Sequence, residues 1–91
     1  MDNERRKQIL DAGEIPVEEF VTIIRDEAWM EDTSFEAVPA QDGGYNIEEH
    51  VWSMNAEHVR VLVRIGRDGQ ITETGGLKDV ELLKKNRVRV L

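Results

Sequence analysis

Apolar and polar residues alternate along residues 59–65, which predicts a β-strand with one buried face. The apolar side chains would point to the core, and the basic side chains would lie on the other face together with one leucine. This alternation is the strongest structural signal in the chain, and it indicates a fold rather than an activity. The predicted core face holds Val59, Val61, Val63 and Ile65, and the opposite face holds Arg60, Leu62 and Arg64.

A glycine-containing turn follows this strand and leads into a second, shorter one. A two-residue loop at positions 68–69 would place Ile71 on the arginine face. A three-residue loop at positions 67–69, with Gly69 as a left-handed bulge residue, instead pairs Ile65 with Ile71. We prefer the three-residue loop because it keeps both isoleucines in the core.

The segment Tyr45–Met54 fits either a helix or a strand. As a helix, it would begin with a capping box formed by Asn46 and Glu49. As a strand, it would pair with residues 59–65 through a turn at residues 55–57, and apolar residues would share one face. We favour the strand, because a shared apolar face is what normally determines register. This register sets Val51 opposite Val61, Ile47 opposite Ile65 and Trp52 opposite Arg60.

The strongest helical pattern lies at Pro16–Met30, where apolar residues recur at spacings of three and four. Pro16 suits the first turn of a helix, since its missing N–H would be unpaired there. Trp29, near the predicted C-terminal end, is expected to cap the core. The apolar stripe consists of Val17, Phe20, Val21, Ile24 and Ala28, with Ile23 and Met30 on its flank.

The remaining segments complete an α+β fold in a single domain, residues 1–91. N-terminal helices pack on a small antiparallel sheet of three to four strands, followed by a short C-terminal helix and a terminal strand. The terminal strand is expected to be an exposed edge that can pair in a homodimer. These segments are a helix at Asn3–Ala12 closed by Gly13, a strand at Phe35–Val38 stopped by Pro39, a helix at Leu77–Lys85 and the strand Arg87–Leu91.

Composition excludes several kinds of chemistry and location. The chain has no cysteine, so disulfides, thiolate nucleophiles and thiolate metal sites are impossible. This composition suits a reducing compartment, and we expect a cytoplasmic protein. The N-terminal residues lack the apolar region of a secretory signal, and no apolar run is long enough for a membrane span, so we expect neither.

The net charge of −7 is unevenly distributed along the chain. Between Asp11 and Glu57, thirteen acidic residues accompany a single basic one, Arg25. Between Val59 and Leu91, eight basic residues outnumber four acidic ones. The acidic part is interpreted as a solvated surface, as a handle for a basic protein partner, or as a mimic of nucleic-acid phosphates.

No arrangement of residues carries a diagnostic catalytic or cofactor motif. Ser34 and Ser53 lie outside any nucleophile elbow, and no glycine pair is followed by the Lys-Ser/Thr of a phosphate loop. His50 and His58 would lie roughly 12–13 Å apart on either a helix or a strand, too far to share a metal ion. We therefore expect a non-enzymatic protein with no catalytic, cofactor or metal site.

The second face of the predicted sheet is the candidate interaction surface, because Trp, Met and Arg are enriched at protein interfaces. A helix covering this face is an equally weighted alternative. The candidate residues are Trp52, Arg60, Leu62, Arg64, His50 and Met54.

The sequence thus predicts a small acidic protein-interaction or regulatory module with an unidentified protein partner. One alternative is an inhibitor that mimics nucleic acid and blocks a DNA- or RNA-binding protein. Another is a small-ligand-binding domain, which would require a pocket near Trp52 and His50. Direct nucleic-acid binding is disfavoured, because the chain is acidic overall and its basic part has few aromatic residues.

Overall fold

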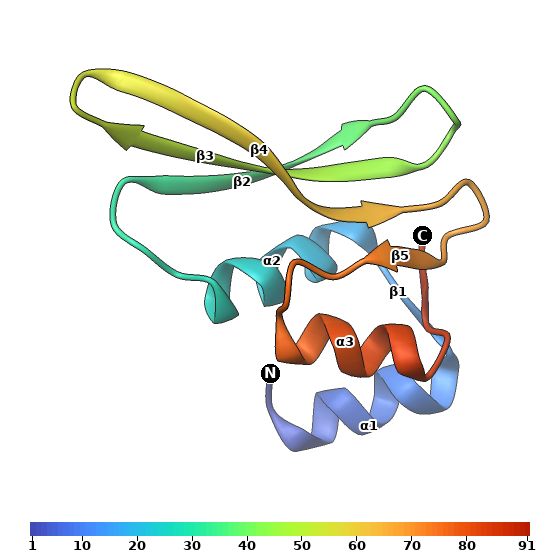
Figure 1. The fold of residues 1–91 in the computed structure, drawn as a ribbon. Coiled ribbons are helices and arrows are strands. Elements are labelled where there is room, and N and C mark those ends of the chain that lie inside the picture. Colours follow the sequence, from blue (N-terminus) through green and yellow to red (C-terminus); the bar gives the residue numbers. More distant parts are fainter.

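A four-stranded antiparallel sheet lies over three helices in the computed structural model, which describes residues 1–91 (Figure 1). The helices are α1 (Asn3–Ala12), α2 (Val17–Glu27) and α3 (Lys78–Lys85). The strands are β1 (Glu14–Ile15), β2 (Thr33–Pro39), β3 (Tyr45–Ser53), β4 (Ala56–Ile65), β5 (Ile71–Glu73) and β6 (Arg89–Val90). The sheet order is β2-β3-β4-β5, and β1 pairs with β6 in parallel. The predicted α+β class and the strand at residues 45–54 are both confirmed.

The apolar face of α2 packs against the sheet and contributes a large part of the core. Phe20 is fully buried, and Ile23, predicted on the flank, is buried as well. The helix ends at Glu27, about one turn before the predicted Met30. Trp29 lies beyond this end and is 71% exposed, so the expectation that it caps the core is wrong.

Helix α1 begins and ends as predicted and is tied to α2 by an ion pair. Gly13 closes the helix at a φ of 74°, and its N–H donates to the carbonyl of Ile9. The left-handed conformation favours glycine here, because a Cβ would be strained at this φ. Arg5 donates from Nε and Nη2 to the two carboxylate oxygens of Glu19, both at 2.6 Å. This bidentate pair connects the exposed sides of the two helices.

Glu19 makes the stability of the fold depend on pH. The hydrogen bonds from Arg5 lower the pKa of the Glu19 carboxyl; burial opposes this effect in part, and the positive charge of Arg5 adds a smaller lowering. Such a carboxyl stabilises the folded protein above its unfolded-state pKa of about 4.3, and this contribution is lost as the pH falls through the folded-state value. We expect Glu19→Gln to lower the free energy of unfolding near neutral pH, measured by urea denaturation.

The difference between wild type and Glu19→Gln should shrink below about pH 4.3 and disappear in stronger acid. Glu18→Gln is the matched control, because Glu18 lies in the same first helical turn, is exposed and has no ion-pair partner. At neutral pH, Glu18→Gln should lower the free energy of unfolding by less than Glu19→Gln does. Parallel pH profiles for wild type and Glu19→Gln would contradict the prediction.

A two-residue turn joins β3 to β4, in place of the predicted turn at residues 55–57. Met54 and Asn55 form this turn with φ angles of 51° and 65°. Positive φ at both central residues is typical of a type I′ turn, whose twist matches that of the two strands. The predicted register and the Trp52–Arg60 pair are therefore wrong. The observed pairs are Val51 with His58, Ile47 with Val63, Trp52 with Glu57 and Glu49 with Arg60.

A bulge in β4 divides the predicted apolar face into two. The register shifts where Ile47 pairs with Val63 and Glu48 pairs with Val61, which leaves Leu62 as an extra residue. One extra residue reverses which face the following side chains occupy. Val63 and Ile65 therefore face the helices and are buried, whereas Val59 lies on the opposite face and Val61 is only partly buried. Leu62 is itself buried, at 8% exposure.

The turn between β4 and β5 agrees with the predicted loop. Ile65 pairs with Ile71, and both side chains are buried. Gly69 has a φ of 84°, the left-handed conformation that this loop requires. The predicted pairing of Ile65 with Ile71 is therefore confirmed.

The C-terminal strand is hydrogen-bonded on both sides, so the expected exposed edge is wrong. The N–H of Arg89 donates to Gly13 on one side, and the N–H of Val90 donates to Gly69 on the other. Val88 and Val90 are buried. Because these backbone groups are already paired, the strand offers no free edge for the predicted pairing with a second copy of the chain.

Candidate functional site

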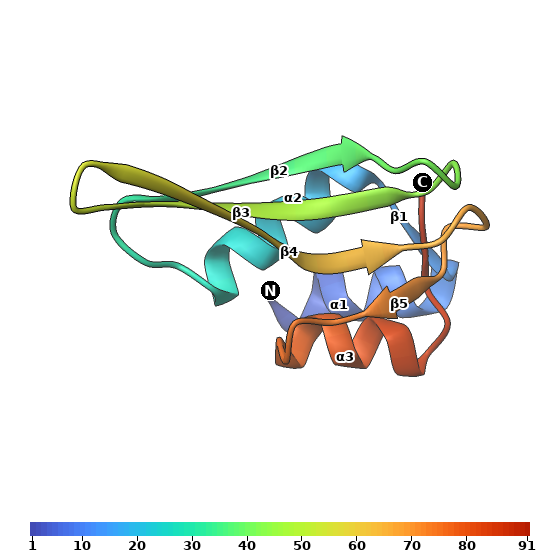
Figure 2. The same ribbon diagram turned by 45° about the horizontal axis from the view of Figure 1, so that its top comes forward.

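The distal half of the β3–β4 hairpin projects beyond the helices, and we call residues 50–60 the hairpin arm (Figures 1 and 2). On its outer face, which points away from the helices, Trp52 is 59% exposed and Val59 is 51% exposed. Met54, at the tip, is 95% exposed. The arm therefore presents three large apolar side chains that the core of this chain does not bury.

The tip of the arm holds Met54 in a backbone conformation that few residues other than glycine adopt. Its φ is 51°, and its side chain is almost fully exposed, so packing does not compensate for this conformation. Positive φ in a non-glycine residue is uncommon, and such conformations cluster at functional sites. The unfavourable backbone conformation of an exposed apolar residue at the tip makes the arm a candidate contact surface.

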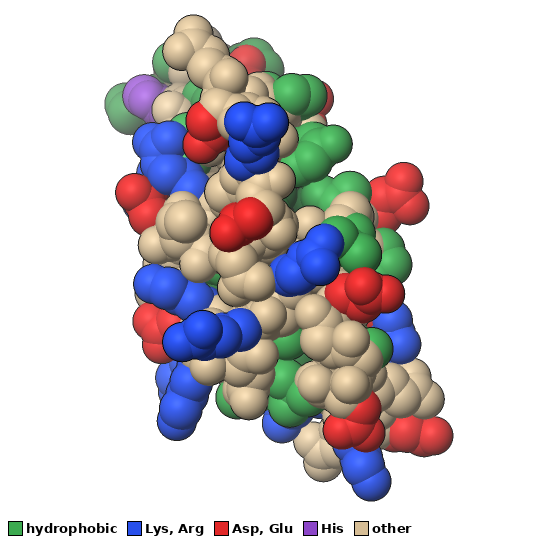
Figure 3. Space-filling view, turned by 90° about the vertical axis from the view of Figure 1, so that its right-hand side faces the viewer, with side chains coloured by type: hydrophobic (Ala, Val, Ile, Leu, Met, Phe, Trp, Pro, Cys, Tyr) green, Lys and Arg blue, Asp and Glu red, His purple; other side chains and the backbone are tan.

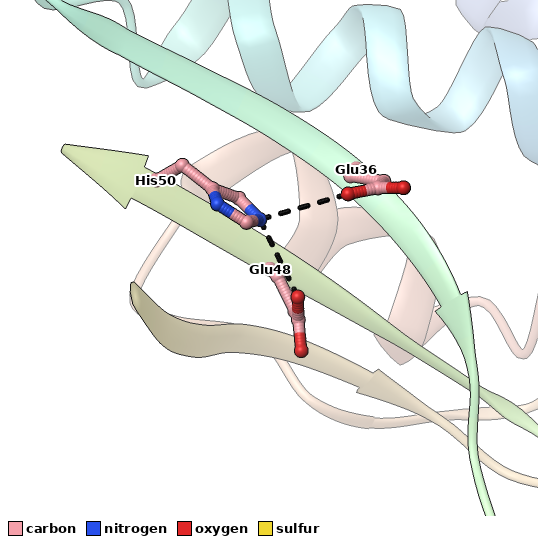
Figure 4. Close-up of side chains that lie close together, drawn as sticks. All are labelled: Glu36, Glu48 and His50. Atoms are coloured by element: carbon pink, nitrogen blue, oxygen red, sulfur yellow. Dashed lines mark ion pairs between the residues drawn. The ribbon is translucent and has the colours of Figure 1, made fainter. Parts of the chain in front are cut away.

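His50 lies on the outer face beside three carboxylates from three strands. Its Nδ1 is 2.5 Å from Glu57 Oε1, on β4. Its Nε2 is 3.4 Å from Glu48 Oε1 on the same strand and 3.7 Å from Glu36 Oε2 on β2 (Figure 4). The imidazole side chain is 20% exposed. We call these four residues the His50 cluster.

The carboxylates favour the protonated form of His50. The hydrogen bond to Glu57 raises the pKa of the imidazole, partial burial lowers it, and the negative charges of Glu57, Glu48 and Glu36 raise it further. No Lys or Arg forms an ion pair with any of these three carboxylates, so the imidazole is their only ion-pair partner. The cluster therefore carries excess negative charge and attracts cations.

The predicted interaction residues do not all lie together. His50 and Trp52 share the outer face, and Met54 is at the tip. Arg64 is exposed, and its Nε forms an ion pair with Glu73 Oε2 at 3.0 Å. Leu62 is buried at the bulge. Arg60 lies on the other face, where its Nε donates to the buried carboxylate of Glu49 at 2.6 Å.

Sequence reasoning missed the carboxylates around His50. Glu48 and His50 are two residues apart on a strand, so a shared face could have been read from the sequence. Glu36 could not, because its position depends on the β2–β3 register that sets it opposite Glu48. His58 lies on the opposite face of the hairpin from His50, opposite Val51.

Neither of the two surface grooves of the molecule is lined by Trp52 or His50, although Glu36 of the His50 cluster borders the first of them. One follows α2 and the edge of β2 and is lined by Val17, Val21, Phe35 and Ala37 among others. The other lies between the β2–β3 and β4–β5 loops. A small-ligand pocket near Trp52 and His50 therefore has no counterpart among these grooves.

The fold and the site define an α+β domain with a projecting hairpin and a cluster of carboxylates on the outer face of its sheet. Comparison of the chain with known protein families, curated proteins and solved structures finds no match. No helix has both the length and the apolar character that a membrane crossing requires.

Proposed function

We propose that this protein is a small protein-interaction module whose hairpin arm binds a basic protein partner. The observation that carries the proposal is the exposure of Trp52, Met54 and Val59 on an arm that extends beyond the core. Trp and Met are enriched at interfaces, where their burial supplies much of the binding free energy. In this function Trp52 and Met54 are the anchors that enter an apolar pocket of the partner.

The charge of the surrounding sheet supports a basic partner. Residues 31–60 contain seven acidic residues and one arginine, which is a net charge of −6 out of −7 for the whole chain. The end of the molecule opposite the hairpin tip carries Lys and Arg side chains interspersed with Asp and Glu (Figure 3). A concentrated negative charge beside apolar anchors steers a positively charged surface toward them and excludes acidic proteins.

Site-specific cross-linking followed by affinity measurement tests this function. A photo-reactive amino acid at position 54 should cross-link a basic protein in a source-cell lysate, whereas the same group at position 45 should not. With that partner purified, Trp52→Ala should weaken binding by at least about 30-fold. Tyr45→Ala is the matched control, because Tyr45 is a partly exposed aromatic residue at the other end of the same strand. It should change the affinity by less than about twofold.

Equal affinities of wild type and Trp52→Ala for the cross-linked partner would overturn the assignment of the arm. Equal cross-linking from positions 45 and 54 would also contradict it. The association rate should fall as salt rises, because exposed charges are screened beyond about 10 Å at 0.1 M salt. Displacement of the protein from its partner by added DNA would favour the nucleic-acid-mimic alternative.

A further inference from the structure

We propose that Glu36, Glu48 and His50 form a binding site for one divalent transition-metal ion, with Zn²⁺ as the best match. The site lies on the outer face of the sheet and uses two neighbouring strands (Figure 4). This inference does not depend on the proposed partner, because metal binding can be measured on the isolated protein.

The positions of the three ligand atoms suit a small metal ion. One atom from each side chain, an imidazole nitrogen and two carboxylate oxygens, lies within 4.8 Å of the others. Zn²⁺ binds such atoms at about 2.0–2.2 Å, which places neighbouring ligands of a tetrahedral site about 3.3–3.6 Å apart. The 3.4 Å from His50 Nε2 to Glu48 already matches this spacing. Glu36, at 3.7 Å and with a 66% exposed side chain, is free to close the remaining distance.

The imidazole of His50 is already oriented for a ligand at Nε2. This nitrogen is buried and has no hydrogen-bond partner, although it points toward two carboxylates. Nδ1 is held by Glu57 at 2.5 Å. A metal ion at Nε2 displaces the proton from that nitrogen, while Nδ1 keeps its proton and donates it to Glu57; a carboxylate that holds the far nitrogen in this way is the usual support of metal-binding histidines.

Register and charge provide two further reasons. Glu36 and Glu48 are directly opposite each other on β2 and β3, so backbone pairing sets their separation. Three carboxylates share a single imidazole, and a divalent cation would neutralise the excess negative charge. The imidazole ligand favours Zn²⁺ over Mg²⁺ and Ca²⁺, which prefer oxygen ligands alone. Three protein ligands leave a fourth position open to water or to another donor.

Calorimetric titration of the chelator-treated, tag-free protein with ZnCl₂ at pH 7.5 tests the site. We expect one ion per chain with a Kd below about 100 µM, and no competition from equimolar Mg²⁺. His50→Gln and Glu48→Gln should each weaken binding by more than about tenfold, and Glu57→Gln should weaken it by about tenfold. His58→Gln is the matched control on the other face of the hairpin and should leave the affinity unchanged.

A second measurement on the wild-type protein does not depend on the folding of any variant. In NMR spectra, Zn²⁺ should shift or broaden the ring Cε1–H signal of His50 and leave that of His58 in place. The proposal is overturned if no ion binds, as expected for a simple ion-pair network. It is also overturned if both histidine signals respond alike, or if His50→Gln binds Zn²⁺ as tightly as the wild type does.

Discussion

Replacing Phe20 by alanine is expected to lower the free energy of unfolding by about 3–5 kcal/mol. Phe20 is a fully buried residue of α2 within the hydrophobic core, so its removal loses apolar burial and leaves a cavity. A chain of 91 residues has a total stability of about 5–14 kcal/mol, so this loss is a large part of it. Urea denaturation followed by circular dichroism measures the change.

Trp29→Ala is the matched control for this prediction. Trp29 is a larger aromatic residue just beyond the end of the same helix, but it is 71% exposed. Its replacement should change the free energy of unfolding by less than about 0.5 kcal/mol. Similar losses for the two variants would mean that Trp29 packs on the core, as the helical pattern alone suggested.

Arg60→Ala is expected to lower the free energy of unfolding by about 2 kcal/mol. Its guanidinium is 68% exposed, yet its Nε donates at 2.6 Å to Glu49, whose side chain is only 7% exposed. Without Arg60, the carboxylate of Glu49 loses its only ion-pair partner. Glu49 is then left beside Phe35, the residue paired with it on β2. The cost is smaller than for a fully buried pair, because water can reach Glu49 once the arginine side chain is gone.

The double variant Glu49→Met/Arg60→Ala distinguishes loss of a charge partner from loss of packing. Methionine has a similar shape to glutamate and needs no partner, so the double variant should recover most of the stability lost in Arg60→Ala. A double variant as unstable as Arg60→Ala would show that the arginine acts through its own packing. If Arg60→Ala itself had no effect, the ion pair would contribute nothing to stability.

The role of Arg60 shows how a register error changes a functional hypothesis. The sequence placed Arg60 opposite Trp52 as part of an interaction surface, whereas the structure pairs it with Glu49 on the other face. The predicted register was wrong because the turn was misplaced. The two turn residues, Met54 and Asn55, include no glycine, which normally signals a two-residue type I′ turn. A change of turn length by one residue moves every following side chain to the opposite face.

The His50 cluster could be predicted only in part, for a similar reason. Alternation along one strand places Glu48, His50 and Trp52 on a common face, and this much is local information. Glu36 and Glu57 reach His50 from other strands. Their approach depends on pairing between segments that are separated in sequence, which local patterns do not specify.

The sequence by itself determined the fold class, the extent of α1, the apolar face of α2 and the loop that pairs Ile65 with Ile71. These features depend on periodicity, helix ends and a glycine in the left-handed conformation, all of which act over a few residues. Only the tertiary structure decided where β4 bulges, which side chains surround His50 and whether the C-terminal strand is free. Each of these depends on long-range backbone pairing, in which one extra residue exchanges the buried and exposed faces.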